Sequence, residues 1–385
     1  MTRLLLPCLL AVWSAVLSAQ PALIPAAPQI AAKAWILMDA NSGRVLAEHN
    51  ADERLPPASL TKLMTSYVLS YELEQGNVRN DDLVTISKNA WAQAPEFQGS
   101  SLMWIEVGKQ VPLGELHKGI VVTSGNDASV AVAEYLAGSQ AAFADVMNQH
   151  AKILGMTNSH FVNAHGLPDP DHYTSARDLA LLSQALLKFP AEYDLYSLRE
   201  HTWSGIRQSN RNRLLWRDSS VDGLKTGHTD AAGYCLVASA KRDGMRLISV
   251  VMGTSSESVR ERETDALLSY GFRYFDTRRL YESGTELIRS KLWAAQQDEI
   301  ALGVRDDVYL TIPRGQQDKL KAEMAMDNVI RGPVQAGTEY GELVVSLDGE
   351  ELLREPLVAL QDIEQAGFFK RIWDSLMLFF IGLFN

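Results

Sequence analysis

The stretch "DGLKTGHTDAAGYCLVASAKRDGMRLISVVMG", residues 222–253, decides the fold class. It predicts successive antiparallel strands, because apolar and β-branched residues follow one another between turn residues, with Arg-Asp-Gly at 242–244 forming one turn. Upstream, "AWILMDANSGRVLAEHN" at 34–50 predicts a hairpin around its Asn-Ser-Gly turn. A helix over about 260–272 is expected to cover the resulting sheet.

The region between these two groups of strands is rich in helix signals. We expect helices over 59–74, over two stretches within 113–137 that "TSGND" separates, over 140–154, and from Ser175, where "SARD" is close to a capping box. Strands at both ends with helices between them indicate an α+β domain over residues 28–274.

The chain changes character after this domain. Segments such as "DVYLTIPRG" and "GELVVSLDGEELLREPLVAL" carry β-branched or alternating residues between glycine and aspartate turns, which predicts a small all-β domain over residues 275–362. A length of 385 residues is sufficient for two such domains.

The last segment, residues 366–385, predicts an amphipathic helix. Lys370, Arg371, Asp374 and Ser375 fall on one helical face, and aromatic and aliphatic residues fill the rest. This pattern suits an anchor that lies in the membrane interface better than a helix that spans the bilayer. The alternative is a terminal helix packed on its own protein.

The N-terminus predicts export. Residues 1–19 place Arg3 before an apolar run from Leu4 to Leu17 and then small residues, which is the layout of a secretory signal peptide. An uncleaved anchor is the alternative. Cleavage would remove Cys8 and leave Cys235 alone, so we expect no intrachain disulfide and a thiol buried in a strand.

Composition argues against several classes of partner. Asp and Glu outnumber Lys and Arg by 47 to 36, and the net charge of -11 provides no surplus of cations for a nucleic acid. No histidine and cysteine cluster has the spacing of a metal site, and no glycine-rich phosphate loop occurs. We therefore expect neither a metal nor a cofactor.

The first predicted helix carries a possible catalytic pair in "PPASLTKLMTSYVLSYEL", residues 56–73. Ser59 and Lys62 are three positions apart and lie on a helical face shared with Ser66. A capped amphipathic helix with a solvated lysine would show the same pattern, and a Ser-x-x-Lys spacing arises by chance about once or twice in a chain of this length. Taken alone, the pair is better interpreted as an ordinary helix start.

Two downstream fragments change this interpretation. "TSGND" places Ser124 and Asn126 at a break between helices, and "LKTGHTD" places Lys225, Thr226 and Gly227 on a predicted strand. A Lys-Thr-Gly triplet is expected only about 0.1 times in a chain of this size. The three motifs in this order resemble the signature set of the penicillin-recognising serine acyltransferases.

The resemblance extends over essentially the whole chain. "PASLTKLMTSYV", "VTSGNDASVAVAEYLAGSQ", "NAHGLPDPDHYTSARDLALL", "IRQSNRNRLLW" and "VDGLKTGHTDAAGYCLVASA" are similar to the serine-type D-alanyl-D-alanine carboxypeptidases (family S11-like) among the low-molecular-weight penicillin-binding proteins. This resemblance implies a β-lactamase/transpeptidase-like catalytic domain, in which an antiparallel sheet meets a helical subdomain. It also implies an enzyme that removes the terminal D-Ala from peptidoglycan stem peptides, with β-lactams as covalent inhibitors and a role in cell-wall remodelling and cell shape. Its place would be the periplasmic face of the inner membrane, where the terminal helix binds the lipid surface.

The resemblance assigns Ser59, Lys62 and Ser124 to catalysis. Ser59 would attack the D-Ala-D-Ala peptide bond, Lys62 would take its proton, and Ser124 would relay a proton to the leaving amine. Lys62 must then be neutral or share its proton, which requires burial or a second cation such as Lys225. The backbone N–H groups of Ser59 and His228 resemble the oxyanion hole of the family.

The same resemblance implies a set of substrate-binding residues, namely Asn126, Lys225, Thr226, Gly227, His228, Arg211 and Arg260. Asn126 would hydrogen-bond the amide backbone of the substrate, and Gly227 would let the strand approach it closely. Lys225 and Thr226 would hold the terminal carboxylate, with the two arginines near the same end. His165 of "AHGL" would lie in a loop that flanks the site.

Two other functions are compatible with parts of this pattern. A β-lactamase would use the same acylation with rapid deacylation, but the extra β domain, the terminal helix and Ser-Gly-Asn in place of the Ser-Asp-Asn of class A β-lactamases argue against it. The chain also lacks an obvious Glu-x-x-Leu-Asn to activate water. A non-catalytic cell-wall-binding protein is disfavoured because the core catalytic residues are all present.

Overall fold

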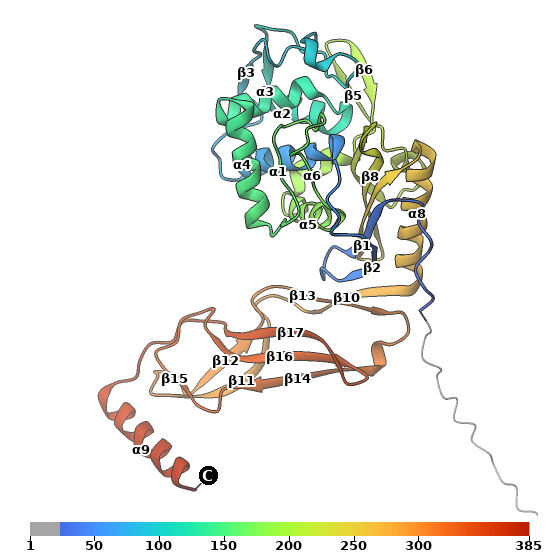
Figure 1. Cartoon of the computed structure of the whole chain (residues 1–385). Helices are drawn as coiled ribbons and strands as arrows, with labels where there is room; N and C mark the ends of the chain where they lie inside the picture. Colours follow the sequence, from blue (N-terminus) through green and yellow to red (C-terminus); the bar gives the residue numbers. More distant parts are fainter. Residues whose placement is uncertain (1–23, 385) are drawn as a thin grey trace, which may run out of the picture.

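The computed structural model describes residues 24–384 of the chain (Figure 1). The signal peptide expected at 1–19 lies outside these residues. Figure 1 shows a larger domain of helices and sheet, a smaller domain of strands beneath it, and the terminal helix α9 extending from the smaller domain.

The larger domain contains a five-stranded antiparallel sheet in the order β2-β1-β9-β8-β7. The strands are β1 (Ala34–Asp39), β2 (Val45–His49), β7 (Val221–Thr229), β8 (Gly233–Arg242) and β9 (Met245–Thr254). Both predicted hairpins are formed, and Asp243 and Gly244 have the positive φ angles, 49° and 85°, that suit a tight turn between β8 and β9. The sheet places β7 at its edge.

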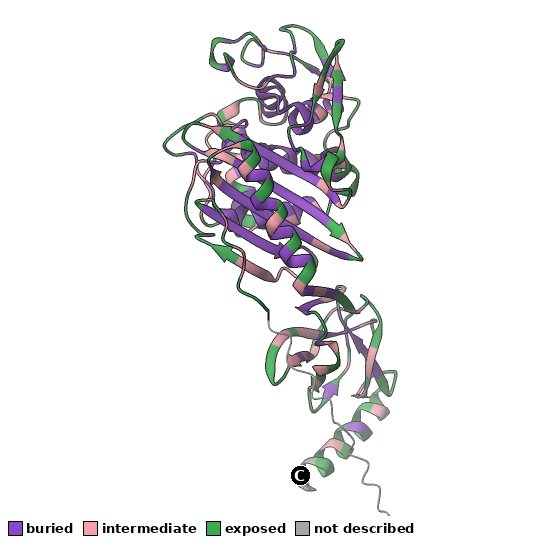
Figure 2. Cartoon of the chain, turned by 90° about the vertical axis from the view of Figure 1, so that its right-hand side faces the viewer, coloured by how far each residue is buried: buried purple, intermediate pink, exposed green. Residues whose placement is uncertain are grey.

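Both faces of this sheet are covered by other parts of the domain. Figure 2 shows its buried strands with a helix crossing the face toward the viewer. Along β8, Leu236 and Ala238 belong to the core that α8 (Glu257–Tyr274) completes, while Cys235 and Val237 belong to the opposite core. This alternation follows from the two-residue period of a strand. Cys235 is buried in its strand, as the sequence predicts, and burial raises the pKa of its thiol to about 11.

The helical part of the domain surrounds α1 (Thr61–Glu74). Three predicted helices are formed and contact it, namely α3 (Asn126–Ala137), α4 (Gln140–Ile153) and α5 (Ala176–Leu186). The Ser175 side chain caps α5 by accepting a hydrogen bond from the Asp178 N–H. Residues 61–70 of α1 are all buried, so Lys62 is not the solvated lysine of an ordinary amphipathic helix.

Shorter elements complete the larger domain. They are β3 (Leu83–Thr85) paired with β4 (Gln110–Pro112), α2 (Leu113–Lys118), a π-helical turn (Gly119–Thr123), α6 (Pro190–Tyr193), β5 (Glu200–Trp203) paired with β6 (Ile206–Ser209), and α7 (Leu214–Arg217). The π-helical turn ends at Thr123, and Ser124 and Gly125 separate it from α3, so the helix pair breaks where "TSGND" predicts it.

The smaller domain is built of strands, as the sequence predicts, apart from a 3-10 turn at Gln317–Lys319. One sheet pairs β10 (Phe275–Tyr281) with β13 (Val308–Pro313). The other has the order β14-β16-β17-β12-β11-β15, formed by β11 (Glu286–Trp293), β12 (Glu299–Gly303), β14 (Leu320–Met326), β15 (Ile330–Arg331), β16 (Glu339–Leu347) and β17 (Glu350–Ala359). Their inward apolar side chains form one separate core.

Polar contacts join the two domains at the turn between β1 and β2. The Asp39 carboxylate accepts a hydrogen bond from the Thr277 hydroxyl at 2.7 Å, and the Ser42 and Thr311 hydroxyls are 2.6 Å apart. Arg44 donates to the carbonyl oxygen of Thr311 at 2.6 Å. The first hairpin of the larger domain therefore rests on the β10–β13 pair.

The terminal helix α9 (Phe368–Phe384) has the two-sided character that the sequence predicts. Its polar side contacts the β domain, where the Asp374 carboxylate accepts a hydrogen bond from the Ala294 N–H at 2.8 Å and Lys370 pairs with Asp298 at 2.7 Å. Large apolar side chains elsewhere on the helix are exposed. No helix within residues 24–384 is long and apolar enough to cross a membrane.

Candidate active site

A cavity of about 200 Å³ lies where the edge strand β7, the turn before α1 and the start of α3 come together. The predicted residues that line it are Ser59, Ser124, Asn126, His165, Arg211, Thr226, Gly227, His228 and Arg260. The two predicted lysines, Lys62 and Lys225, lie behind this lining and are only 1% and 4% exposed. The fold therefore brings every residue of the predicted site to one place.

Ser59 sits in a 3-10 turn (Ala58–Leu60) directly before α1. Ala58 has a φ of 50°, a left-handed conformation that is strained for a residue with a Cβ. The loop containing Gly166 packs so closely on this turn that a Cβ at Gly166 would lie 1.8 Å from the carbonyl oxygen of Ala58. Backbone packing, rather than the helix alone, holds Ser59 in position.

Lys62 reaches three groups with its amine. Its Nζ lies 3.1 Å from Ser59 Oγ, 2.7 Å from Asn126 Oδ1 and 2.6 Å from the carbonyl oxygen of His165. A neutral amine keeps two hydrogens and one lone pair. It can therefore donate to the two shorter contacts and direct its lone pair at the Ser59 hydroxyl.

The surroundings of Lys62 favour this neutral form. Burial lowers its pKa from the ordinary value of 10.5 to about 7, because the charged form loses its hydration. The Asp127 carboxylate opposes this shift, and the Arg211 guanidinium adds to it. The sequence suggested burial or a second cation such as Lys225. Burial is the main cause of the lowered pKa, Arg211 adds to it, and the Lys62 and Lys225 amines also repel each other.

Lys225 makes a similar pair with Ser124. Its Nζ donates to Ser124 Oγ at 3.0 Å and to the carbonyl oxygen of Thr226 at 3.1 Å. Burial lowers the pKa of Lys225 well below its ordinary value, and the positive charges of Lys62 and the two predicted arginines lower it further. Ser59 and Ser124, the two serines that the sequence assigned to catalysis, are thus each paired with a buried lysine.

The Ser-Gly-Asn segment joins the π-helical turn to α3. Ser124 has a left-handed φ of 61°, and the Asn126 N–H donates to the carbonyl oxygen of Ser101 at 2.8 Å. The side-chain oxygen of Asn126 is used by Lys62. Its amide NH₂ group is therefore the part suited to a substrate carbonyl.

Asp127 is a site residue that sequence reasoning missed. Its buried carboxylate accepts hydrogen bonds from the N–H groups of Met103, Trp104 and Ile105 at 2.8, 2.9 and 3.2 Å. It thereby holds the segment after Ser101, a residue of the cavity wall, and it is the carboxylate that acts on the Lys62 pKa. The signal available in the sequence was an acid directly after Asn126.

Gly227 was expected to let the substrate approach its strand closely. In this structure, the group that lies close to Gly227 is the protein's own turn before α1. A Cβ at Gly227 would lie 3.0 Å from the carbonyl oxygen of Pro57 and 3.1 Å from Leu60 Cγ. That separation is tighter than ordinary contact, so a side chain would push β7 away from the Ser59 turn. The glycine is required to bring these two elements together.

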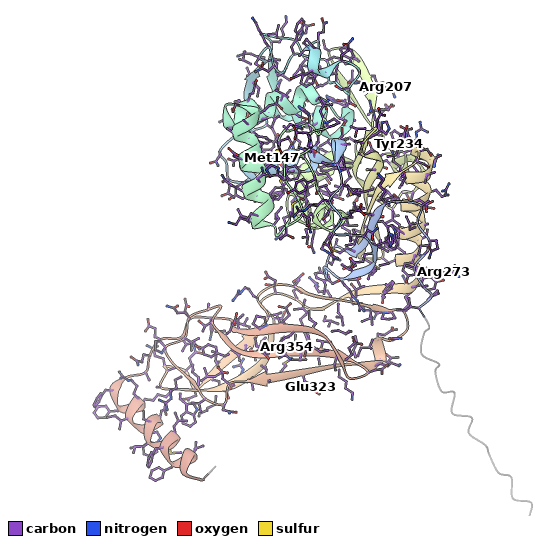
Figure 3. The ribbon with its side chains drawn as sticks, in the orientation of Figure 1. Met147, Arg207, Tyr234, Arg273, Glu323 and Arg354 are labelled. Carbon is purple, nitrogen blue, oxygen red and sulfur yellow. The ribbon has the colours of Figure 1, made fainter. Side chains whose placement is uncertain are left out.

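One end of the cavity is lined by cationic and aromatic groups. The His228 ring stacks on Tyr234, which is labelled in Figure 3, with ring centroids 3.9 Å apart. The Arg260 guanidinium lies 5.7 Å from the Tyr234 ring centroid and contacts the carbonyl oxygen of Gly227 at 3.4 Å. Arg260 is buried and Arg211 is exposed, so the two arginines approach the cavity from different depths.

His165 contributes mainly through its backbone. Its carbonyl oxygen accepts the hydrogen bond from Lys62, while burial, the charge of Lys62 and His172 lower the pKa of its imidazole to about 3. The ring is therefore neutral at physiological pH. In the described part of the chain, no cluster of three or more His, Cys, Asp or Glu side chains could hold a metal ion.

The sequence matches two family models. Residues 22–256 match the model described as D-alanyl-D-alanine carboxypeptidase, and residues 275–365 match the C-terminal domain of penicillin-binding protein 5. Among curated proteins, the D-alanyl-D-alanine carboxypeptidase DacA of Escherichia coli K12 is 49% identical over 93% of this chain and 90% of its own length. DacC of the same strain is 45% identical over 92% and 90%.

Solved structures agree with these matches. Penicillin-binding protein 5 from Haemophilus influenzae superposes with a TM-score of 0.83 at 42% identity, covering 88% of this chain and 99% of that one. Penicillin-binding protein D2 from Listeria monocytogenes, solved in an ampicillin-bound form, superposes with a TM-score of 0.56 at 30% identity over 63% and 98% of the two chains.

Proposed function

The chain belongs to the D-alanyl-D-alanine carboxypeptidase family, and we propose that Ser59 is its nucleophile and Lys62 the base that activates it. It is a hydrolase that removes the terminal D-Ala from stem peptides of peptidoglycan. The observation that carries the assignment is a buried lysine amine, with a pKa of about 7, at 3.1 Å from the Ser59 hydroxyl. A serine hydroxyl is too weak a nucleophile without such a base.

Acylation proceeds from this pair. Lys62 takes the proton of Ser59 Oγ as that oxygen bonds to the carbonyl carbon of the D-Ala-D-Ala peptide bond. The backbone N–H groups of Ser59 and His228 stabilise the oxyanion of the tetrahedral intermediate. Lys62 then gives this proton, through the Ser124 hydroxyl that Lys225 holds, to the departing amine, so the C–N bond breaks, D-Ala leaves and Lys62 is neutral again.

Hydrolysis of the acyl-enzyme completes the cycle. A water molecule gives a proton to Lys62 and adds to the ester carbonyl, and the ester C–O bond to Ser59 breaks. Ser59 Oγ regains a proton from Lys62, so the base returns to its neutral form. The stem peptide, shortened by one residue, is released with a new carboxylate.

Charge and backbone geometry support the placement of the substrate. Its terminal carboxylate meets Lys225 and Thr226, with the Arg211 and Arg260 guanidiniums nearby. The amide NH₂ group of Asn126 donates to the substrate backbone, since the side-chain oxygen is engaged by Lys62. A β-lactam carries a carboxylate and a reactive amide carbonyl in a similar relation, which makes it a covalent inhibitor of the same serine.

Two assays on the full chain test this function. We expect a fluorescent penicillin to label the protein lastingly, and a peptide ending in D-Ala-D-Ala to release D-Ala. Rapid turnover of the lactam without lasting label would indicate a β-lactamase instead. Absence of both label and release would indicate a non-catalytic wall-binding protein.

The location follows from the two ends of the chain. We place the enzyme on the periplasmic face of the inner membrane, exported by residues 1–19 and held by α9. The exposed apolar side of α9, with its polar side on the β domain, supports an interfacial anchor. The family of cell-wall enzymes to which the chain belongs agrees with this location.

Deleting residues 367–385 is expected to move the protein from the membrane fraction to the soluble fraction, because α9 supplies the apolar surface that enters the lipid. A finer test compares Phe379→Glu, which places a charge on an exposed apolar residue, with Ser375→Glu at an exposed polar position of the same helix. The first should weaken sedimentation with anionic vesicles and the second should not. A truncated chain that still pellets with membranes would exclude the anchor.

A further inference from the structure

A second cavity of about 470 Å³ is lined by segments of the chain that also line the active site, and no step of the proposed mechanism uses it. We term it the annex; its lining includes Arg54, Leu55, Pro56, Pro168, Tyr173 and Ala231. Its walls are mainly apolar, in contrast to the polar active-site cavity. Its size lies within the range of pockets that hold small molecules or short peptide segments.

Three segments of the chain line both cavities. Residues 54–56 line the annex, and Ser59, three residues later, lines the active site. Residues 165–167 line the active site, and 168–170 of the same loop line the annex. The end of β7 and its turn contribute Thr226–Thr229 to the active site and Ala231 to the annex. The same three segments of the chain therefore contribute to the lining of both cavities.

The proposed function, on which this inference rests, sets the direction of the substrate. The terminal carboxylate lies at Lys225 and Thr226, and the carbonyl under attack lies at the N–H of His228. The rest of the acyl group therefore continues past Thr229 toward Ala231. Residues 228 and 231 are at most about 11 Å apart along the chain, a span that roughly three extended peptide residues cover.

The annex offers one charged group suited to that part of the substrate. The Arg54 guanidinium lies 4.9 Å from the Tyr173 ring centroid, and its Nε donates to Asn158 Oδ1 at 3.3 Å. Its terminal nitrogens remain suited to a carboxylate. Asp169 on the same rim uses one carboxylate oxygen to accept the Asp171 N–H at 2.8 Å.

We propose that the annex is a subsite for the acyl-side residues of the stem peptide, with its apolar wall against their aliphatic atoms and Arg54 on the free carboxylate of the γ-linked glutamate. That glutamate is the third residue on the acyl side of the cleaved bond, which matches the span to Ala231. The annex would make the enzyme prefer complete stems over short D-Ala-D-Ala peptides, without taking part in the chemistry.

The test compares kcat/KM of the full chain for three substrates. These are L-Ala-γ-D-Glu-L-Lys-D-Ala-D-Ala, the same pentapeptide with the glutamate carboxylate converted to an amide, and the short Nα-acetyl-L-Lys-D-Ala-D-Ala. The variants are Arg54→Ala, which removes the charge, and Ala231→Trp, which fills the annex from an exposed position. Arg289→Ala, at an exposed arginine on β11 of the other domain, is the matched control.

We expect Arg54→Ala to lower the ratio of kcat/KM for pentapeptide over short substrate about tenfold, the size of a lost charge-assisted hydrogen bond. With the wild-type enzyme, the ratio of kcat/KM for the amidated pentapeptide over the short substrate should already be this low. Arg54→Ala should lower that ratio little further. Ala231→Trp should lower the ratio for both pentapeptides, and Arg289→Ala should leave it as in wild type.

Two results would overturn the subsite. One is an unchanged ratio in both variants, and the other is an equal loss on long and short substrates, which indicates a structural effect. In both cases D-Ala release by wild type would leave the proposed function standing. Failure of wild type to release D-Ala from any of the three would instead remove the proposed function, and the subsite with it.

Discussion

Replacing Ser59 by alanine is expected to lower D-Ala release by at least about 10⁴-fold, because the variant has no oxygen to form the acyl-enzyme. The cavity and the Lys62 contacts to Asn126 and His165 would remain. The measurement is D-Ala released per enzyme from a D-Ala-D-Ala peptide, together with covalent labelling by a fluorescent penicillin. Both signals should disappear together, because both require the same ester bond.

The matched control is Ser197→Ala, at an exposed serine whose hydroxyl donates to the carbonyl oxygen of Asp194. It should retain wild-type release and labelling. Covalent penicillin on the Ser59→Ala variant, mapped by mass spectrometry of the labelled peptide, would transfer the role of nucleophile to another serine. Circular dichroism and thermal unfolding of each variant would show that lost activity is not lost folding.

Replacing Lys62 by arginine is expected to abolish acylation, with a fall in the penicillin labelling rate of about 10³-fold or more. A guanidinium keeps its proton at all physiological pH values, so it cannot accept the proton of Ser59. It also carries more donors than the three acceptors around Lys62 Nζ were placed to receive. Normal penicillin binding by Lys62→Arg would refute the role of the lysine as base.

The same residue predicts the pH dependence of the wild-type enzyme. Burial lowers the Lys62 pKa to about 7, and the neutral form, which dominates above that pKa, is the base in the proposed mechanism. The acylation rate should therefore rise with pH through about 7 and fall about tenfold per pH unit well below it. The measurement is the second-order rate of penicillin labelling between pH 5 and pH 9. A rate that is flat across this range would show that Lys62 does not titrate there.

Much of the architecture could be predicted because its causes are local. The hairpin at 34–50 and the strands of 222–253 follow from residue alternation and turn residues. The cap of α5 at Ser175 and the break after the π-helical turn follow from short segments whose conformations depend on their own side chains. The α+β domain and the small all-β domain could both be expected on these grounds.

The residues of the candidate site could also be predicted from the sequence, but for a different reason. Ser59, Ser124 and the Lys225 triplet were joined by a resemblance to known motifs, since nothing in their spacing along the chain places them together. The tertiary structure then added Asp127, whose hydrogen bonds to residues 103–105 cross more than twenty positions of sequence. It also showed that Gly227 lies against the turn at residues 57–60, a contact that the sequence did not suggest.

The sequence by itself determined which segments become strands and helices and which residue types the site contains. Only the tertiary structure decided that Lys62 is a buried amine with a lowered pKa and not a solvated cation. The groups that surround its amine come from Ser59, 3 positions away, Asn126, 64 away, and His165, 103 away. Proton affinity depends on how completely such distant segments exclude water, and that exclusion exists only after the chain has folded.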